Sequence, residues 1–321
     1  MKSQNTAIIG AGITGLYLAQ KLSEQGHKVT LFEKRSEIGK MACSGLFSEE
    51  VLAFFPESES LVENRITSVV VHFPKKTVRV RFKTPFLVMS HAELDRLAAK
   101  KAEASGVRIL LNKHIEDLPR EFDKIIGCDG ANSAVRQALN LKPPSFRLGI
   151  LGFFDKKDNT DFVETWAVKN GFIWRIPRGE RTEYGILSGI VEAKAIFESF
   201  LKKENVKLSE IKSGLVPQGL VFAKNDSVTL CGDAVGLTKP WSGGGVVFGL
   251  TSAQILVDSF PDFKEYRKRL KKRFKLKIIV LKIFTQVVYF LGFNFPRILP
   301  KNIKIENDAI FPNFIKFTEN H

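Results

Sequence analysis

Three glycines near the start of the chain, Gly10, Gly12 and Gly15, have the spacing of a phosphate-binding turn. Gly10 permits a tight turn, Gly12 lets a pyrophosphate approach the backbone, and Gly15 allows a helix to pack closely on a sheet. The N-terminus of that helix offers free N–H groups and the positive end of its dipole to a phosphate. Further along, Glu33 can accept hydrogen bonds from a ribose hydroxyl. These residue types predict a dinucleotide site.

The stretches around these glycines predict the elements that position them. Residues 6–10 and 28–32 are typical of short buried strands, and residues 13–25 are typical of a helix. Such a strand–helix–strand unit opens a Rossmann-type domain, and Glu33 would stand at the tip of its second strand. The glycine motif alone does not distinguish FAD from NAD.

The remaining stretches predict a second sheet beside the first. Residues 65–86 alternate apolar and polar side chains around Pro74-Lys75-Lys76, which indicates a β-hairpin. Residues 146–190 are rich in β-branched and aromatic residues between turn signals, which indicates an antiparallel sheet. We further expect strands over 107–112, 124–127 and 227–231, and helices near 48–55, over 93–104 and over 244–259.

Two later motifs favour FAD by resemblance. Residues 126–136, which include Asp129 and Gly130, resemble the Asp-Gly motif of the flavoprotein monooxygenase superfamily. Residues 230–234, Leu-Cys-Gly-Asp-Ala, resemble that superfamily's Gly-Asp motif, whose aspartate holds the flavin ribityl chain. All three motifs stand in the superfamily's order and spacing, so the resemblance implies non-covalently bound FAD.

Three further segments resemble the geranylgeranyl reductase family of that superfamily. Residues 39–48 resemble its cysteine–glycine loop, and residues 232–245 resemble the loop that follows its Gly-Asp motif. Residues 172–177, Phe-Ile-Trp-Arg-Ile-Pro, resemble its aromatic-x-Trp-x-Phe-Pro motif, although Ile176 replaces the Phe and Leu187 replaces the second glycine of the Gly-x-Gly that follows. The resemblance covers roughly residues 5–255 and includes archaeal digeranylgeranylglycerophospholipid reductases.

The resemblance implies roles around FAD for individual residues. Thr14 and Glu33 would contact the ADP half, Ile115 would offer a backbone contact to adenine, and Asp233 would bind the ribityl chain or pyrophosphate. The full set of expected cofactor-binding residues is Gly10, Gly12, Thr14, Gly15, Glu33, Lys34, Arg35, Ser44, Gly45, His91, Arg96, Ile115, Asp129, Gly130, Asp233, Ala234, Pro240, Gly243, Gly244, Gly245 and Val246.

Two of these expectations concern charge near the flavin. Gly245 and Val246 begin a helix whose N–H groups would stabilise negative charge on the reduced flavin ring. The family has an arginine that grips FAD where this chain has His91, and Arg96 stands nearby as a substitute.

The family reduces isolated double bonds of isoprenoid chains, which implies a hydride from the flavin, a proton from an acid and a dry, apolar site. Cys43 is the candidate proton donor, and Trp174 is the candidate aromatic wall. Phe172 and Trp241 are further candidate walls. We expect Phe153, Phe154, Cys128 and Cys231 to be core residues, and the cysteine spacing gives no metal site.

The net charge of +15 is concentrated near the C-terminus, where residues 264–282 contain ten Lys or Arg and one Glu. Residues 278–293 are apolar but shorter than a membrane span needs, and Leu270, Phe274, Ile278, Leu281 and Thr285 recur at helical spacing. We expect residues 264–293 to bind an anionic membrane surface rather than cross it. A solvated helix face is the alternative, and sparse aromatic residues disfavour nucleic acid.

We therefore expect an α/β fold similar to that of p-hydroxybenzoate hydroxylase. Residues 1–60, 88–143 and 220–260 would form a Rossmann-type FAD-binding domain, interleaved with an antiparallel β-sheet substrate domain over 61–87 and 144–219. Residues 261–321 would form a basic, apolar helical region. Without a signal-peptide pattern at residues 1–9, we expect a cytoplasmic protein held peripherally at the membrane.

The predicted function is an FAD-dependent oxidoreductase acting on a prenyl lipid. The electron donor stays open between NAD(P)H and ferredoxin, since no second nucleotide motif is present. One alternative is a flavin-dependent halogenase or monooxygenase, because residues 172–177 are one residue from the halogenase Trp-x-Trp-x-Ile-Pro motif. Another is a flavin-binding membrane protein without turnover.

Overall fold

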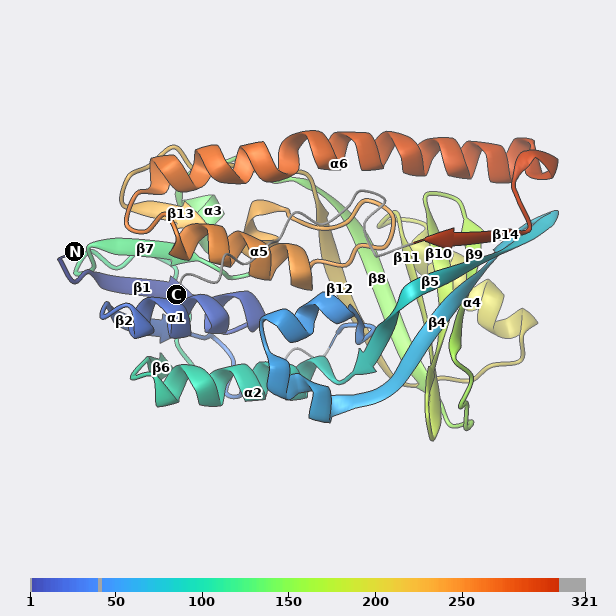
Figure 1. The fold of residues 1–321 in the computed structure, drawn as a ribbon, viewed down its shortest axis with the longest axis horizontal. Coiled ribbons are helices and arrows are strands. Elements are labelled where there is room, and N and C mark those ends of the chain that lie inside the picture. The colour runs from blue at the N-terminus through green and yellow to red at the C-terminus, as the bar shows by residue number, and fades with distance from the viewer. Residues whose placement is uncertain (1, 40–41, 306–321) are drawn as a thin grey trace.

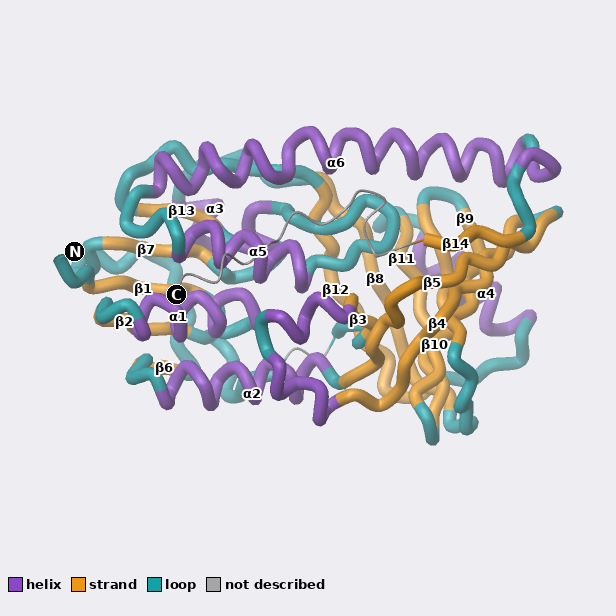
Figure 2. Tube along the Cα trace, viewed as in Figure 1, coloured by secondary structure: helices purple, strands orange, loops and turns teal. Residues whose placement is uncertain are grey.

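The computed structural model describes residues 2–39 and 42–305, which fold around two β-sheets (Figures 1 and 2). The smaller sheet is parallel, with the strand order β13-β7-β1-β2-β6. Its strands come from distant parts of the chain, as the sequence predicts. They are β1 (Asn5–Ile9), β2 (Lys28–Phe32), β6 (Arg108–Leu110), β7 (Lys124–Gly127) and β13 (Val228–Leu230).

Helices pack beside the parallel sheet in one apolar core. α2 begins where Ser90 accepts a hydrogen bond from the Glu93 N–H at 3.3 Å, and it ends before Gly106, whose φ is 91°. α3 begins in the same way, with Ser133 accepting from the Arg136 N–H at 2.9 Å. The helices are α1 (Ile13–Glu24), α2 (His91–Ala104), α3 (Ala134–Ala138) and α5 (Val246–Val257).

The larger sheet has the order β12-β8-β11-β10-β9-β4-β5-β14, with β3 paired to β5. The pairs β4–β9 and β5–β14 are parallel, and the other pairs are antiparallel. Its strands are β3 (Leu46–Ser48), β4 (Val62–Phe73), β5 (Lys76–Met89), β8 (Ser145–Phe154), β9 (Phe162–Val168), β10 (Gly171–Arg178), β11 (Arg181–Ser188), β12 (Ser209–Gln218) and β14 (Asn302–Ile305).

Short elements complete the chain. The helix expected near residues 48–55 is a 3₁₀-helix, η1 (Glu49–Ala53). It ends before Pro56, because a proline disfavours helical backbone at the residue before it, and Pro56 is the first residue of a second 3₁₀-helix. The others are η2 (Pro56–Leu61), η3 (Gly232–Val235), η4 (Pro296–Ile298) and the surface helix α4 (Ala193–Lys203).

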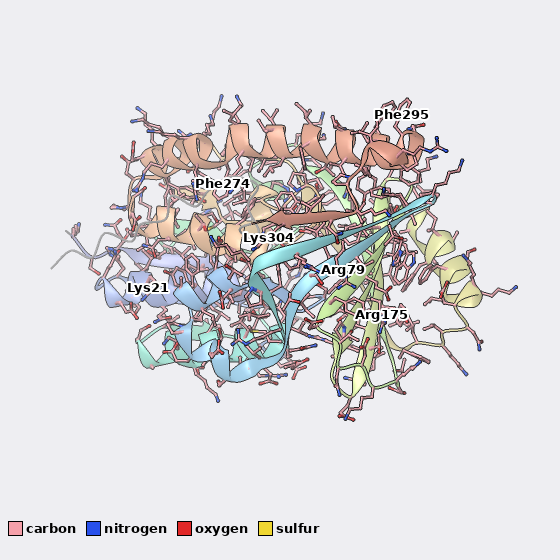
Figure 3. All side chains as sticks on the ribbon, turned by 45° about the vertical axis from the view of Figure 1, so that its right-hand side comes forward. Lys21, Arg79, Arg175, Phe274, Phe295 and Lys304 are labelled. Atoms are coloured by element: carbon pink, nitrogen blue, oxygen red, sulfur yellow. The ribbon has the colours of Figure 1, made fainter. Side chains whose placement is uncertain are left out.

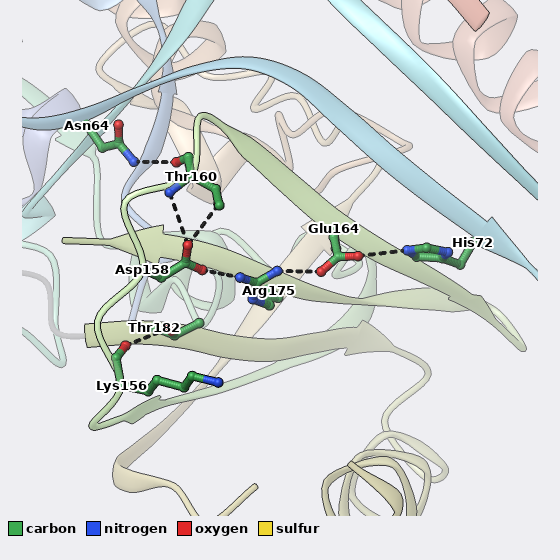
Figure 4. A network of polar contacts seen from close by, with 8 residues as sticks. All are labelled: Asn64, His72, Lys156, Asp158, Thr160, Glu164, Arg175 and Thr182. Carbon is green, nitrogen blue, oxygen red and sulfur yellow. Dashed lines mark hydrogen bonds and ion pairs between the residues drawn. The ribbon is translucent and has the colours of Figure 1, made fainter. Parts of the chain in front are cut away.

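One face of the larger sheet carries a network of charged side chains. On one face Arg175 of β10 donates hydrogen bonds to Glu164 and to Asp158, each at 2.5 Å, and Glu164 pairs with His72 of β4 at 3.1 Å (Figure 4). Because side chains alternate along a strand, Arg175 points away from its neighbour Trp174. The polar network therefore joins β4, β9 and β10 on the face that also carries the small apolar cluster of Ile173 and Ile186, while the cluster around Trp174 lies on the opposite face.

α6 (Phe263–Asn294) runs along one side of the molecule across both sheets, and η4 and β14 follow it (Figure 1). Its first half enters the core beside the parallel sheet, where the Tyr266 hydroxyl donates to the Leu230 carbonyl at 3.0 Å. Its second half reaches the larger sheet, where the Tyr289 hydroxyl donates to the Gly171 carbonyl at 3.0 Å and Gly292 packs on the Phe73 ring. The predicted basic helical region is thus integrated with both sheets, while residues 306–321 lie outside the described residues.

The apolar face predicted on this helix packs inward. Leu270, Phe274 and Leu281 are buried, and Figure 3 shows Phe274 on the side of α6 that faces the protein. That face therefore does not point to a membrane, and the sequence interpretation was wrong on this point. A second apolar row, offset around the helix and spaced by three or four residues, is exposed instead. It consists of Leu276, Ile279, Ile283, Val287 and Phe290.

The packing of α6 predicts different costs for two leucines. We expect Leu281→Ala to lower the free energy of unfolding by about 2–5 kcal/mol, because this fully buried side chain would leave a cavity. Leu276→Ala, the matched control at a 71% exposed position, should change it by less than about 0.5 kcal/mol. Urea denaturation measures both values, and equal costs for the two variants would contradict the packing described.

Candidate active site

The glycine turn between β1 and α1 is built by close backbone contacts. Gly10 has a φ of 107°, and a Cβ atom there would lie 2.4 Å from the Cys128 carbonyl oxygen. A Cβ atom at Gly15 would lie 2.1 Å from the Gly10 carbonyl oxygen, so side chains are excluded at both positions. A Cβ atom at Gly12, in contrast, would meet no atom within 4 Å. Space for a pyrophosphate is therefore available at Gly12.

Glu33 lies beside this turn at the end of β2. Its Oε2 accepts a hydrogen bond from the Ala11 N–H at 2.9 Å, and its Oε1 accepts two from Arg35, each at 3.0 Å. Burial opposes ionisation of Glu33, but the hydrogen bonds from Arg35 and Ala11 outweigh burial and lower its pKa. The ionised carboxylate has lone pairs left for a ribose hydroxyl.

The segment that follows β6 runs beside Glu33. The Lys113 N–H donates to the Glu33 carbonyl at 2.8 Å, and the Asn112 N–H donates to the Arg35 carbonyl at 3.0 Å. Ile115, the predicted adenine contact, lies in this segment and is partly buried. Lys34, the residue after Glu33, is exposed. The structure therefore brings the segment of Ile115 to the rim of the predicted site.

The Asp-Gly motif follows β7, the strand next to β1. Asp129 Oδ2 accepts from the Val135 N–H at 3.1 Å, whereas Oδ1 is buried and has no hydrogen-bond partner among the described residues. Arg136 donates to the Ala131 and Ala234 carbonyls, at 2.5 and 3.1 Å, and so joins the second motif to the third. An orphaned buried carboxylate oxygen is consistent with a ligand that donates a hydrogen bond to it.

The Gly-Asp motif lies against both the first helix and the start of α5. A Cβ atom at Gly232 would lie 3.0 Å from the Thr14 side chain, and one at Gly249 would lie 2.5 Å from Thr14 Oγ1. A Cβ atom at Gly245 would lie 2.6 Å from Asp233 Oδ1. The aspartate therefore stands at the N-terminus of α5, whose first turn has no acidic residue to compete for its N–H groups.

The three motifs converge, and their residues fit FAD. Gly12 leaves room for a pyrophosphate, Glu33 is an ionised acceptor, and Asp129 holds an unsatisfied oxygen. Which residues contact the cofactor stays a prediction for the whole expected set. Of its other members, Gly130 is partly exposed and Ala234 is buried. Pro240, Gly243 and Gly244 lie in the segment that leads into α5, and Val246 is the first residue of that helix.

The cysteine–glycine loop packs on the larger sheet. Gly45 has a φ of 60°, and a Cβ atom there would lie 2.3 Å from the Met89 carbonyl oxygen and 2.6 Å from Arg178 Nη1. Cys43, two residues earlier, is partly buried and interacts with both His91 and Glu183. The predicted catalytic thiol is therefore within electrostatic reach of two buried titratable side chains.

Trp174 lies on the apolar face of the larger sheet. Its ring covers Gly185 of β11, where a Cβ atom would lie 2.2 Å from the indole, so the conformation requires glycine in the predicted motif. The indole N–H donates to Glu183 Oε1 at 2.8 Å. Trp174 therefore positions a buried acid, while its predicted catalytic role remains a prediction.

Glu183 is fully buried beside Trp174. Burial raises its pKa to about 8, although Arg178, whose Nε lies 3.6 Å from Oε2, opposes this rise. At neutral pH the side chain is therefore a protonated carboxylic acid. A buried acid that is neutral at pH 7 marks this cluster as a candidate site for proton transfer.

His91 is the first residue of α2, and it is only 5% exposed. Its ring meets the Phe47 ring edge-on, and its Nε2 lies 3.4 Å from Asp95 Oδ1. Burial would lower the pKa of His91, but Cys43 and Asp95 outweigh burial and raise it to about 10. Arg96, the predicted substitute for the family arginine, pairs with Glu93. The FAD contacts expected of His91 and Arg96 stay predictions.

An apolar cluster surrounds Trp174 and adjoins the loop of the third motif. A Cβ atom at Gly243 would lie 2.6 Å from Leu187 Cδ2, which belongs to the cluster. Phe153 is buried in it, as predicted, and Phe154 packs instead near Tyr184. The buried members are Ile66, Val88, Leu151, Phe153, Val163, Trp174, Ile176 and Leu187, and Phe172 packs on them.

Sequence analysis missed Glu183, Arg178 and Asp95. Glu183 belongs to no known motif, but it follows Arg181 by two residues along a strand whose later members Gly185 and Leu187 share its face. An acid at a position that faces an apolar cluster is the signal that could have identified it. Asp95 could have been found from its spacing of four residues from His91 on a helix.

The family described as NAD(P)-binding Rossmann-like domain matches residues 8–50. A digeranylgeranylglycerophospholipid reductase from Methanocaldococcus jannaschii is 24% identical over 84% of this chain and 82% of its own length. The structure of a geranylgeranyl bacteriochlorophyll reductase-like protein from Thermoplasma acidophilum has a TM-score of 0.75, with 19% identity over 91% of this chain and 89% of its own.

A flavin-dependent brominase has a TM-score of 0.72, with 14% identity over 91% of this chain and 89% of its own. These findings confirm the predicted fold class and the predicted resemblance to geranylgeranyl reductases. At such identities, the solved structures establish the fold alone.

Proposed function

We propose that this protein binds FAD non-covalently and saturates double bonds in the isoprenoid chains of a lipid. The observation that carries the proposal is the buried Trp174–Glu183 pair, which the loop of the third motif adjoins at an apolar cluster and whose acid lies within electrostatic reach of Cys43. Relatives named digeranylgeranylglycerophospholipid reductase, which match most of the chain, support the substrate class.

Four features of the chain support the parts of the proposed reaction. Glu33, Asp129 and Asp233 would hold the cofactor, which supplies a hydride when it is bound and reduced. The apolar cluster around Trp174 would hold an isoprenoid chain and exclude water, which suits a carbon–carbon double bond that has no polar group to grip. Cys43 would hold the proton that the second carbon of the bond receives. The donor that reduces the flavin stays open between NAD(P)H and ferredoxin.

A flavin-dependent halogenase or monooxygenase is the second candidate, because a brominase shares the fold. The cysteine–glycine loop favours the reductase, since it places a thiol beside two buried proton-holding side chains. The two functions differ in their need for oxygen. A halogenase or monooxygenase consumes O₂ with its substrate, whereas a reductase saturates the bond without it.

We expect the purified, FAD-loaded protein to convert digeranylgeranylglycerophospholipid to saturated products under anaerobic conditions with dithionite as reductant. Mass spectrometry would show the addition of two hydrogens for each saturated bond. Cys43→Ala should keep its FAD and lower the rate by about 10²-fold or more, because a proton donor is lost. An unchanged lipid, together with substrate-dependent O₂ uptake in air, would contradict the proposed function.

We also infer that α6 holds the protein on the cytoplasmic surface of an anionic membrane. The outward row from Leu276 to Phe290 is apolar, and it continues an outward basic row made by Lys268, Lys271, Lys272 and Lys275. Attraction to anionic lipid headgroups would stabilise membrane binding by about 1 kcal/mol for each nearby lysine. The apolar row would enter the interface between the headgroups and the acyl chains.

The helix itself leaves open whether it lies on or crosses a membrane. The helix has 32 residues, and the mean hydropathy of its most apolar 18-residue window is 1.8. By length and composition alone, α6 could therefore cross a membrane. The buried side chain of Leu281 and the hydrogen bond of Tyr289, however, fix one side of it to the protein. Interfacial binding is therefore the form that we propose.

The outward row predicts a specific loss of vesicle binding. The double variant Ile283→Ser with Val287→Ser should lower affinity for phosphatidylglycerol vesicles at least tenfold, because each buried apolar side chain contributes roughly 1.5–3 kcal/mol. Val191→Ser with Ile211→Ser is the matched control, since both positions are exposed and apolar elsewhere on the surface. Vesicle sedimentation checks both, and equal binding by the two double variants would remove the inference. Deleting the whole helix is unsuitable, since it would strip Leu270, Phe274 and Leu281 from the core.

A further inference from the structure

Cys43 and two buried partners form a cluster that the resemblance does not assign. His91 starts α2, Asp95 lies one turn later on the same helix, and Cys43 approaches from the loop before β3. Asp95 is fully buried and His91 nearly so. Neither ring nitrogen of His91 makes a hydrogen bond of ordinary geometry within the described part of the chain. A buried polar ring in this state is expected to have a functional partner.

The charges around the cluster favour a protonated His91. The Asp95 carboxylate lies 3.4 Å from Nε2 and stabilises an imidazolium, as does Cys43. Phe47, which covers the ring, is apolar and carries no competing charge. On its other side Cys43 is influenced by Glu183, which Arg178 and Glu63 flank. The loop of Cys43 packs around the start of α2, since the Met89 N–H donates to the Gly45 carbonyl at 2.9 Å and a Cβ atom at Gly39 would lie 3.1 Å from the Ala92 Cβ.

We propose that His91, held by Asp95, is the positioning residue that supplies Cys43 with its proton, so that the three side chains form a thiol–imidazole–carboxylate relay. The proposal rests on the proposed reductase function and deepens it. It replaces neither FAD nor Trp174 in that function. It gives His91 a role in proton supply in place of the FAD contact that the family arginine suggests.

The balance of the proton step is simple. Reduced FAD, where bound as proposed, would supply a hydride with its electron pair, and the substrate double bond would take its proton from the Cys43 thiol. The S–H bond breaks, a C–H bond forms at the second carbon, and the electron pair stays on sulfur. The His91 imidazolium N–H then passes its proton to the thiolate, and water reprotonates the imidazole.

The coupling of Cys43 to His91 can be measured without turnover. Cys128 and Cys231 are buried, so alkylation by iodoacetamide, mapped by peptide mass, reports on Cys43 in the FAD-loaded protein. At pH 7 we expect His91→Gln to slow alkylation about tenfold, because an adjacent imidazolium stabilises the reactive thiolate. Asp95→Asn should slow it by a smaller factor. His114→Gln, a matched change at an exposed histidine, should leave the rate unchanged.

Three results would overturn the relay. The first is alkylation of the His91→Gln variant at the wild-type rate between pH 6 and 9. The second is slowed alkylation in Glu183→Gln but not in His91→Gln, which would move proton supply to the other side of the thiol. The third is loss of bound FAD from His91→Gln with normal alkylation, which would restore the role of His91 as a cofactor contact. Flavin content and the unfolding midpoint of each variant exclude a general loss of structure.

Turnover then separates the relay from the proposed function. If wild-type protein saturates the lipid, His91→Gln should lower kcat by about 10²-fold and change its pH profile, while KM stays near the wild-type value. An unchanged kcat with an unchanged pH profile overturns the relay and leaves the reductase function intact. If the wild-type protein saturates no lipid, the reductase function fails whatever the alkylation rates show.

Discussion

The close approach of backbone to backbone at the glycine positions is the constraint on which the site depends. Gly10 lies against the Cys128 carbonyl, and Gly15 lies against the Gly10 carbonyl, at distances that leave no room for a Cβ atom. This contact presses the start of α1 onto β1 and β7 together. The Asp-Gly and Gly-Asp motifs follow β7 and β13, so the strand order carries their aspartates to the same edge. A larger residue at Gly10 or Gly15 would separate the elements that the site joins.

A similar constraint acts where the larger sheet meets this edge. The Trp174 ring lies against Gly185, and the Arg178 guanidinium lies against Gly45. Both partners of Glu183 therefore occupy space that a side chain at these glycine positions would fill. The polar network on the opposite face, centred on Arg175, fixes the strands without placing charge near the apolar cluster. The sheet therefore offers an apolar cluster with the buried Glu183 acid beside it, and Arg178 and Arg181 lie at its edge over the Phe153 ring. α6 adds to this arrangement by fastening both sheets together from one side.

Much of this architecture was predictable from the sequence because its signals are local. The strand–glycine turn–helix unit, the hairpin around Pro74 and the two later motifs each show in a short stretch of residues. Which face of α6 packs inward was not predictable, because the helix carries two apolar rows and the sequence does not tell which of them is buried. Leu281 faces the core while Ile283 faces outward, and this depends on the position of Phe73 and Gly171 far away in the chain.

The Glu183 interactions were hidden for a related reason. Its pairing with Trp174 depends on the register of β10 on β11, and the proximity of Cys43 to His91 depends on where an irregular loop packs. Motif resemblance singled out the cysteine, the tryptophan and the glycine as site residues, which stays a prediction, but it gave no sign of the buried acid Glu183. Only the packed structure shows that proton-holding side chains gather around the thiol.

The central claim is that three distant motifs hold one FAD, and Gly12 offers its most direct test. Gly12 has an ordinary φ of −83°, and a Cβ atom there meets nothing in the protein, so Gly12→Val should fold normally. The added side chain would occupy the space that the pyrophosphate needs. Flavin absorbance after reconstitution should show one FAD per wild-type chain and none in Gly12→Val, and the two proteins should have equal unfolding midpoints when FAD is absent. A colourless wild-type protein, or full FAD uptake by the variant, would contradict the account.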